Sequence, residues 1–363
     1  TGVHTIYFQV KDNDQNWSPE ASAILFYGVP APQESEPNNI VGSASLMEIG
    51  RQYQGKMDTQ GDMDWFRIPV PQPGMLTIEA VNPSAIGIRF ELAMYTPYVD
   101  WASVYTSASN SGDSVTLRWD LSVGGDYFLR LRNLDNLPEG EYTVTATLDA
   151  VEDPFEPNQD FTRAAPIEIN DSLDAFIFPR GEEDWYEVNF STPGAFHTSL
   201  TSVPENLKME IVIYGSDLNW LSVYTFAGNP GDNVFLDYDI PAPGTYFIRI
   251  RDMQNTRNIE GAYTFTTSFE PVVDVFEPNP DVWRAKLVTQ SPVQAYIFPR
   301  GDQDFYQLFV STEGSLDIMA DQVPENMRIE LVLYDANYSW MALFNTSPSK
   351  GEPVLLQRNL GVG

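Results

Sequence analysis

Apolar and polar residues alternate with a period of two along most of the chain, a pattern typical of half-buried β-strands. One alternating run extends from Phe66 to Val70, and a second extends from Leu76 to Ala80 after a Pro-Gly turn. Because only a short turn separates these two runs, we expect them to pair as a hairpin. No segment has a convincing helical period, so the pattern predicts an all-β fold.

The sequence contains three copies of one module with a period of about 120 residues. The motif Gly-Asp-x-Asp followed by two aromatic residues begins at Gly61 and returns at Gly181 and Gly301, with Glu182 replacing the first Asp in the second copy. A Glu-Pro-Asn motif precedes each copy. About seven or eight short strands fit into each module, and this number predicts tandem antiparallel β-sandwiches, similar to jelly rolls.

The repeats define the expected domain boundaries. We assign residues 1–31 to a β-hairpin, 32–150 to the first repeat, 151–271 to the second and 272–363 to the third, which we expect to lack its last two strands. The hairpin resembles the last two strands of a bacterial immunoglobulin-like domain, on the basis of its Trp-Ser-Pro-Glu loop. A lone hairpin is not stable in water, so we expect these residues to be either the end of a preceding immunoglobulin-like module or strands donated to another copy of the chain.

Charge and composition narrow the possible partners. The 363 residues include 51 acidic and 20 basic side chains, which gives a formal net charge of −31. Such a surface repels nucleic acids and anionic lipids and attracts cations, calcium above all. No apolar stretch is long enough for a transmembrane helix, so membrane insertion is not expected. The absence of cysteine excludes disulfides and thiolate zinc sites.

The repeated motifs resemble the bacterial pre-peptidase C-terminal (PPC) domain. The resemblance covers residues 32–363 and is carried by the Glu-Pro-Asn segment, the Gly-Asp-x-Asp strand start and the closing Gly-x-Tyr-Phe and Tyr-Thr-Val strands. It implies β-sandwiches attached to secreted peptidases or surface proteins, of which several bind calcium. It also implies a calcium site where the Glu-Pro-Asn segment meets the Asp-rich strand start.

Each repeat supplies oxygen ligands of the kind that calcium prefers, namely carboxylates and amide carbonyls. Carried over by position, the candidate ligands are Glu34, Glu36, Asn38, Asp62 and Asp64 in the first repeat, Glu156, Asn158, Glu182 and Asp184 in the second, and Glu277, Asn279, Asp302 and Asp304 in the third. Asp153 and Asp274 lie one residue farther from the motif than Glu34 does. The competing interpretation is that Glu-Pro-Asn is a linker turn and Asp-x-Asp a solvated strand cap.

Catalysis is not expected, and no catalytic or cofactor-binding residue is predicted. The chain has only two histidines, which do not recur with the repeats, and an acidic signature present three times does not match a tuned acid–base pair. The repeated Trp101, Trp220 and Trp340 offer a sugar-stacking platform, although core or edge packing is the commoner role of such residues.

These observations predict a non-catalytic, extracellular or cell-surface bacterial protein built from calcium-stabilised modules, with a structural or adhesive role. Residues 1–28 and the open third repeat fit head-to-tail self-association into a filament by strand donation, and they fit equally a window of three periods taken from a longer tandem array. The alternative is a targeting appendage of a secreted peptidase that binds a collagen-like protein of the extracellular matrix or a polysaccharide.

Overall fold

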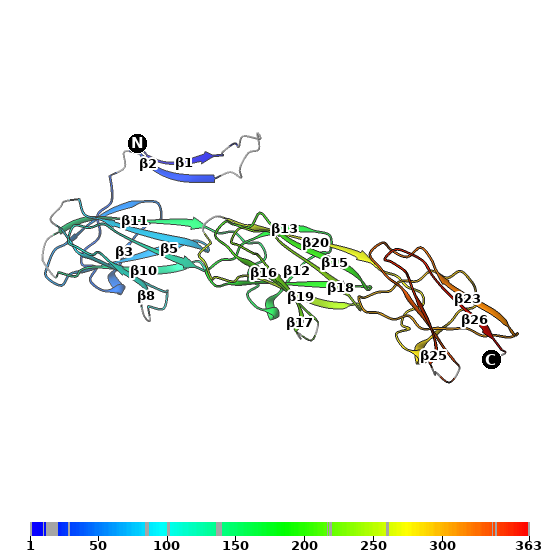
Figure 1. Ribbon diagram of the computed structural model, residues 1–363. Helices are drawn as coiled ribbons and strands as arrows, with labels where there is room; N and C mark the ends of the chain where they lie inside the picture. Colours follow the sequence, from blue (N-terminus) through cyan, green and yellow to red (C-terminus); the bar gives the residue numbers. More distant parts are fainter. Residues whose placement is uncertain are drawn as a thin grey trace. The chain divides into compact units, whose positions relative to one another are not determined.

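A computed structural model describes residues 2–9, 11, 21–27, 30–83, 87–99, 102–135, 140–215, 217, 220–258, 261–335, 337 and 340–361. The fold is all-β, as the alternating pattern predicts, and consists of several sheets whose strands pair mostly antiparallel (Figure 1). At the N-terminus, β1 (Gly2–Phe8) pairs with β2 (Ala21–Tyr27) as an antiparallel hairpin.

The first repeat is a sandwich of two sheets. The order of the five-stranded sheet is β3-β5-β10-β7-β8, and that of the four-stranded sheet is β4-β11-β6-β9. A 3₁₀ turn, η1 (Val41–Ser43), precedes β3. The strands are β3 (Ser45–Leu46), β4 (Gln52–Met57), β5 (Met63–Val70), β6 (Gly74–Val81), β7 (Phe90–Tyr95), β8 (Ala102–Ser107), β9 (Val115–Leu121), β10 (Gly125–Asn133) and β11 (Gly140–Ala150).

The second repeat has the same plan, with sheet orders β12-β14-β19-β16-β17 and β13-β20-β15-β18. Its 3₁₀ turn, η2 (Phe161–Arg163), is capped by the side chain of Asp160, which accepts a hydrogen bond from the amide of Thr162. The strands are β12 (Ala165–Pro166), β13 (Ser172–Ala175), β14 (Glu183–Phe190), β15 (Gly194–Thr201), β16 (Met209–Tyr214), β17 (Trp220–Phe226), β18 (Val234–Ile240), β19 (Gly244–Asp252) and β20 (Tyr263–Pro271).

The expected hairpin between the runs 66–70 and 76–80 is wrong. These runs lie in β5 and β6, which belong to different sheets: β5 pairs with β3 and β10, and β6 pairs with β9 and β11. The chain crosses between the two layers at this turn. The alternating pattern identifies both strands because each has one face on the common core, but it carries no information about which strand lies beside it.

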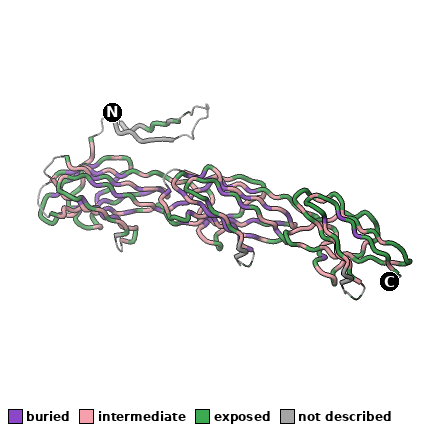
Figure 2. Tube along the Cα trace, in the orientation of Figure 1, coloured by how far each residue is buried: buried purple, intermediate pink, exposed green. Residues whose placement is uncertain are grey.

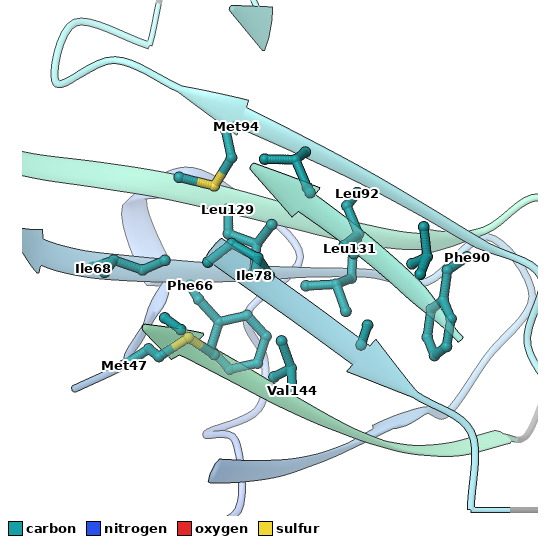
Figure 3. Close-up of a cluster of buried hydrophobic side chains, with 14 of the residues drawn as sticks. Met47, Phe66, Ile68, Ile78, Phe90, Leu92, Met94, Leu129, Leu131 and Val144 are labelled. Carbon is teal, nitrogen blue, oxygen red and sulfur yellow. The ribbon is translucent and has the colours of Figure 1, made fainter. Parts of the chain in front are cut away.

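The cores lie between the paired sheets. Phe66, Ile78 and Leu129, which come from β5, β6 and β10, are fully buried together in the first repeat (Figure 3). Burying each such side chain contributes about 1.5–3 kcal/mol, so the inward-facing positions of both sheets dominate the stability of the repeat.

The described part of the third repeat forms smaller sheets, β21-β22, β23-β26 and β24-β25, after the 3₁₀ turn η3 (Val282–Arg284). It has no counterpart of β10 and β11 among the described residues. Leu308 is accordingly 38% exposed, whereas Val188 at the same position of the second repeat is fully buried, and Figure 2 shows fewer buried positions in this repeat. The strands are β21 (Lys286–Leu287), β22 (Tyr306–Gln307), β23 (Gly314–Ala320), β24 (Glu330–Tyr334), β25 (Trp340–Thr346) and β26 (Val354–Leu360).

The chain divides into two compact units. The first comprises Thr1–Val188, Thr198–Leu236 and Tyr246–Thr267, and the second comprises Asn189–His197, Asp237–Thr245 and Ser268–Gly363. The first repeat and its acidic motifs therefore lie within the first unit, and those of the third repeat lie within the second.

Candidate metal centre

Each repeat gathers three carboxylates whose oxygen atoms all lie within 4.8 Å of one another. The three clusters are Glu34, Glu36 and Asp64, then Glu156, Glu182 and Asp184, then Glu277, Asp302 and Asp304. The first cluster takes two residues from the segment around Glu-Pro-Asn and one from the strand start, whereas the other two clusters take one residue from that segment and two from the strand start. The structure thus brings together the two acidic motifs that the sequence separates by about 25 residues.

In the first repeat, backbone hydrogen bonds fix the Glu-Pro-Asn segment against the start of β5. The amide of Asn38 donates to Glu36 Oε2 at 2.9 Å, which turns the carboxylate back over the segment. The amide of Trp65 donates to the carbonyl of Asn38 at 3.1 Å, and this bond joins the segment to the strand that carries Asp64. The same two bonds recur in both other repeats.

The asparagine of each motif, Asn38, Asn158 or Asn279, is fully buried. Asn38 donates through Nδ2 to Glu34 Oε2 at 3.1 Å, while its Oδ1 atom has no hydrogen-bond partner. Asp64 Oδ1 is likewise buried without a partner. Two orphaned oxygen atoms in one acidic cluster suit a hard cation, because a buried acceptor otherwise costs about 1–3 kcal/mol.

The first acidic residue of the strand start holds the preceding loop. Asp62 Oδ2 accepts the amide of Asp58 at 2.7 Å, and its Oδ1 accepts that of Met63 at 3.1 Å. Asp62 itself is not among the three clustered carboxylates of its repeat, whereas Glu182 and Asp302 are.

Glu182 preserves this arrangement despite its longer side chain. Its Oε2 accepts the amide of Phe178 at 3.1 Å, and Asp302 Oδ2 accepts that of Phe298 at the same distance. Glu182 Oε1 remains buried without a hydrogen-bond partner, so the replacement of Asp by Glu leaves one oxygen available to a cation.

Asp153 and Asp274 lie near the clusters, although the sequence alone left their role open. Asp153 Oδ2 accepts the amide of Phe176 at 2.7 Å, and Asp274 Oδ2 accepts that of Tyr296 at 2.6 Å. Both carboxylates lie close enough to raise the pKa of neighbouring cluster members, Asp184 and Asp304 respectively. Each of the second and third repeats therefore has a further carboxylate near its cluster of three.

Tyrosine hydroxyls from the last strands complete two of the sites, and the sequence motifs gave no sign of them. Tyr142 on β11 donates towards Asp64 Oδ2 at 2.6 Å and Glu34 Oε2 at 2.9 Å. Tyr263 on β20 contacts Asp184 Oδ2 in the same way. Burial raises the pKa of both phenols well above the usual value, so both stay protonated and serve as donors.

The carboxylates are held in an environment that disfavours their charge. Burial, followed by the charge of Glu34, raises the pKa of Asp64 to about 9. Burial and then the charge of Asp184 raise the pKa of Glu182 to about 11. In the half-exposed third site, burial raises the pKa of Asp304 only to about 6. A divalent cation removes the mutual repulsion that contributes to these shifts.

Residues 182–252 match the family model of the bacterial pre-peptidase C-terminal domain. The matched residues lie within the second repeat. PPC domains are non-catalytic accessory domains found in secreted bacterial proteins. The first and third repeats share the motifs of the second, although the matched region covers the second alone.

Several solved structures are similar to the chain. The PPC domain of a collagenase from Bacillus anthracis is 13% identical, with 33% of this chain and 99% of that chain covered and a TM-score of 0.24. The PBSX exported protein XepA is 11% identical, with coverages of 60% and 84% and a TM-score of 0.19. The secreted serine protease VesC from Vibrio cholerae is 13% identical, with coverages of 58% and 51% and a TM-score of 0.22. No curated protein matches the chain.

Two further observations concern the other sequence predictions. The described residues contain no helix with the length and apolar character needed to cross a bilayer. Of the three repeated tryptophans, Trp101 and the side chains of Trp220 and Trp340 lie outside the part of the chain that the structure describes.

Proposed function

We propose that the chain is a non-catalytic, extracellular array of PPC-like modules, each stabilised by one calcium ion, with a structural or adhesive role at the bacterial cell surface. The observation that carries the proposal is the threefold recurrence of a carboxylate cluster with all-oxygen donors. Calcium takes six to eight such ligands. In the first repeat the ligands would be Glu34, Glu36, Asn38 and Asp64, with Asp62 supporting the loop beside them.

Calcium would act here as a link between the leading segment and the module. Glu34 and Glu36 precede β3, whereas Asp64 lies on β5, so one ion would join two parts of the chain that backbone hydrogen bonds already bring together. An ion that binds only the folded state stabilises a protein by mass action. The gain is about 2.7 kcal/mol when the concentration of free ion is a hundred times the dissociation constant.

The direct test is calorimetric titration with calcium, combined with melting curves in calcium and in excess chelator. We expect binding and a melting temperature that falls on chelation. The variant Asp64→Asn/Asp184→Asn/Asp304→Asn should lose both effects. A matched variant, Asp126→Asn/Asp237→Asn/Asp317→Asn, changes the same number of charges at exposed positions and should keep them. Melting curves of the unaltered chain that do not respond to calcium would overturn the proposal.

Head-to-tail assembly remains a prediction, and the topology sets a condition on it. β1 pairs with β2 along seven residues, whereas β10 and β11, the strands that the hairpin would replace, belong to opposite sheets. A donated hairpin must therefore open so that one strand enters each layer. Sedimentation velocity at rising protein concentration tests this, since growing polymers are expected and a constant monomer would contradict assembly.

The second candidate function is a targeting appendage of a secreted peptidase, with a collagen-like protein or a polysaccharide as ligand. The observation that favours it is a set of exposed aromatic residues at equivalent strand positions of the three repeats, namely Tyr105 on β8, Tyr224 on β17 and Phe344 on β25. Solvent-facing aromatic groups that recur at one position suit binding to a surface rather than core packing.

A further inference from the structure

The outer face of the five-stranded sheet carries the same arrangement of side chains in the first and second repeats. In the first repeat the strand register places Tyr105, Ala93, Arg130 and Trp65 in one line across β8, β7, β10 and β5. Their neighbours along the strands, such as Phe66 and Leu129, point into the core and are fully buried. The line therefore faces away from the core.

The second repeat has the same line. Tyr224, Val212 and Arg249 are paired across β17, β16 and β19. The Arg249 guanidinium carbon lies 6.0 Å from the ring centroid of Trp185, which takes the place of Trp65. We call these residues, with Tyr95 and Tyr214 beside them, the aromatic rows.

The third repeat keeps the aromatic members of the row. Phe344 is paired with Val332 across β25 and β24, and Phe305 lies 6.1 Å from Tyr334 between ring centroids. A cavity of about 320 Å³ opens on this face, lined by Glu330, Val332, Tyr334 and Phe344.

Contacts within the rows hold the rings in fixed positions. Trp65 and Tyr95 have ring centroids 4.9 Å apart, and Trp185 and Tyr214 are stacked at 5.2 Å. Arg249 also lies 5.8 Å from the ring of Tyr214. A ligand that binds here would meet preorganised rings, which lowers the entropic cost of association.

Ion pairs place hydrogen-bonding groups beside the rings. Glu91 accepts from Arg130 through Oε1 and from Arg132 through Oε2, both at 2.7 Å. Glu210 accepts from Arg249 at 3.1 Å and from Arg251 at 2.6 Å, both through Oε2. These charge-assisted hydrogen bonds hold the guanidinium groups, which are hydrogen-bond donors, beside the rings.

The outermost ring of each row is partly exposed to solvent. Tyr105 is 72% exposed, Tyr224 47% and Phe344 54%. A side chain so exposed contributes little buried area to folding, yet an aromatic ring occupies this position in all three copies. Exposed apolar groups that form a pattern mark a contact surface.

Charge decides between classes of ligand. The chain carries a net charge of −31, which repels anionic polymers. Within the second row, Arg249 and Arg251 are balanced by Glu210 and Glu183, so no excess positive charge is available to an acidic ligand. An uncharged ligand with many hydroxyl groups and apolar ring faces fits this surface.

We propose that the aromatic rows bind a neutral polysaccharide, whose sugar rings stack on the exposed tyrosines while its hydroxyl groups bond to the arginine–glutamate pairs. The inference deepens the targeting function and involves none of the candidate metal ligands. All measurements are made in calcium, so a negative result leaves the calcium proposal intact.

The test is affinity electrophoresis of the complete chain in gels that contain xylan, galactomannan or mixed-linkage β-glucan. We expect at least one of these polymers to retard the protein. The variant Tyr105→Ala/Tyr224→Ala should weaken that binding at least tenfold, whereas Tyr105→Phe/Tyr224→Phe should stay within about threefold because the rings remain. Phe235→Ala is the matched control, since Phe235 is 65% exposed but lies on β18 of the other sheet.

Three results would overturn the inference. The first is no retardation by any of the three polymers, and the second is retardation that Tyr105→Ala/Tyr224→Ala leaves unchanged. The third is binding to an immobilised triple-helical Gly-Pro-hydroxyproline peptide without binding to any polysaccharide, which would assign the rows to a protein ligand. Circular dichroism of each variant establishes that the sheets are intact before binding is compared.

Discussion

Glu34 and Asp153 occupy the same place in their repeats although they stand at different distances from the Glu-Pro-Asn motif. Glu34 Oε1 accepts the amide of Lys56, and Asp153 Oδ2 accepts that of Phe176, which is 120 residues later. Glu34 lies two residues before Glu36, whereas Asp153 lies three residues before Glu156. The extra methylene of glutamate in the first repeat offsets the one-residue difference in the backbone.

This equivalence predicts that the length of the side chain matters at Glu34. In Glu34→Asp, the carboxylate is too short to keep both the Lys56 amide and its contact with Tyr142, so we expect calcium affinity at the first site to fall about tenfold or more. Isothermal titration measures the loss. Glu79→Asp, at an exposed position of β6, is the control and should bind as the unaltered chain does. Equal affinities for all three proteins would contradict the assignment.

Removal of the Tyr142 hydroxyl should weaken both the site and the fold. In Tyr142→Phe, Asp64 and Glu34 lose a shared donor, and we expect a stability loss of about 1–3 kcal/mol in chelator together with lower calcium affinity. Tyr127→Phe separates the two effects, because that hydroxyl donates to the carbonyl of Val123 away from the site. Denaturant unfolding and calcium titration are compared for both variants. A Tyr142→Phe protein with unchanged affinity would show that the hydroxyl does not orient the ligands.

The three sites should differ in affinity, with the third the weakest. Asp64 and Asp184 are fully buried and receive a tyrosine from the last strand, whereas the described part of the third repeat supplies only Tyr306, at 3.2 Å from Asp304 Oδ2. A more exposed, less constrained site binds calcium less tightly. We expect Asp304→Asn to remove the weakest phase of the titration, while Asp64→Asn and Asp184→Asn each remove a tighter one. Three indistinguishable sites would contradict this order.

The sequence was sufficient to predict the strands and the acidic motifs but not the pairing between strands. The alternation at Phe66, Ile68 and Val70 follows from one buried face, which each strand shows by itself. The parallel pairing of β3 with β5 and the separation of β5 from β6 depend on contacts across the sandwich. Such contacts leave no local periodicity, and for this reason the expected hairpin was wrong.

The candidate site was predicted to a similar degree. The recurring Glu-Pro-Asn and Asp-x-Asp motifs identified carboxylates that the structure brings within 4.8 Å. Tyr142 was recognised only as a strand residue, since nothing in the spacing of 78 positions between it and Asp64 indicates a hydrogen bond. The equivalence of Glu34 and Asp153 could not be predicted from position alone. Glu34 has the longer side chain but lies one residue closer to its Glu-Pro-Asn motif than Asp153 does.

Stability without calcium should fall as the pH rises, in contrast to the usual behaviour of surface carboxylates. The pKa of Asp64 is raised to about 9 and that of Glu182 to about 11, so the metal-free fold binds protons that the unfolded chain releases above about pH 4. For one such carboxyl the free energy of unfolding decreases by roughly 1.4 kcal/mol per pH unit between the unfolded and folded pKa values. Calcium replaces those protons, so its stabilising effect should grow with pH.

Melting curves at pH 5, 6.5 and 8 test this, each recorded with calcium and with chelator. The difference between the two melting temperatures should increase with pH, and Asp64→Asn/Glu182→Gln should make the melting temperature in chelator depend less on pH. If the difference in melting temperature between calcium and chelator stays constant or narrows towards pH 8, these carboxylates are not the groups whose protons calcium replaces.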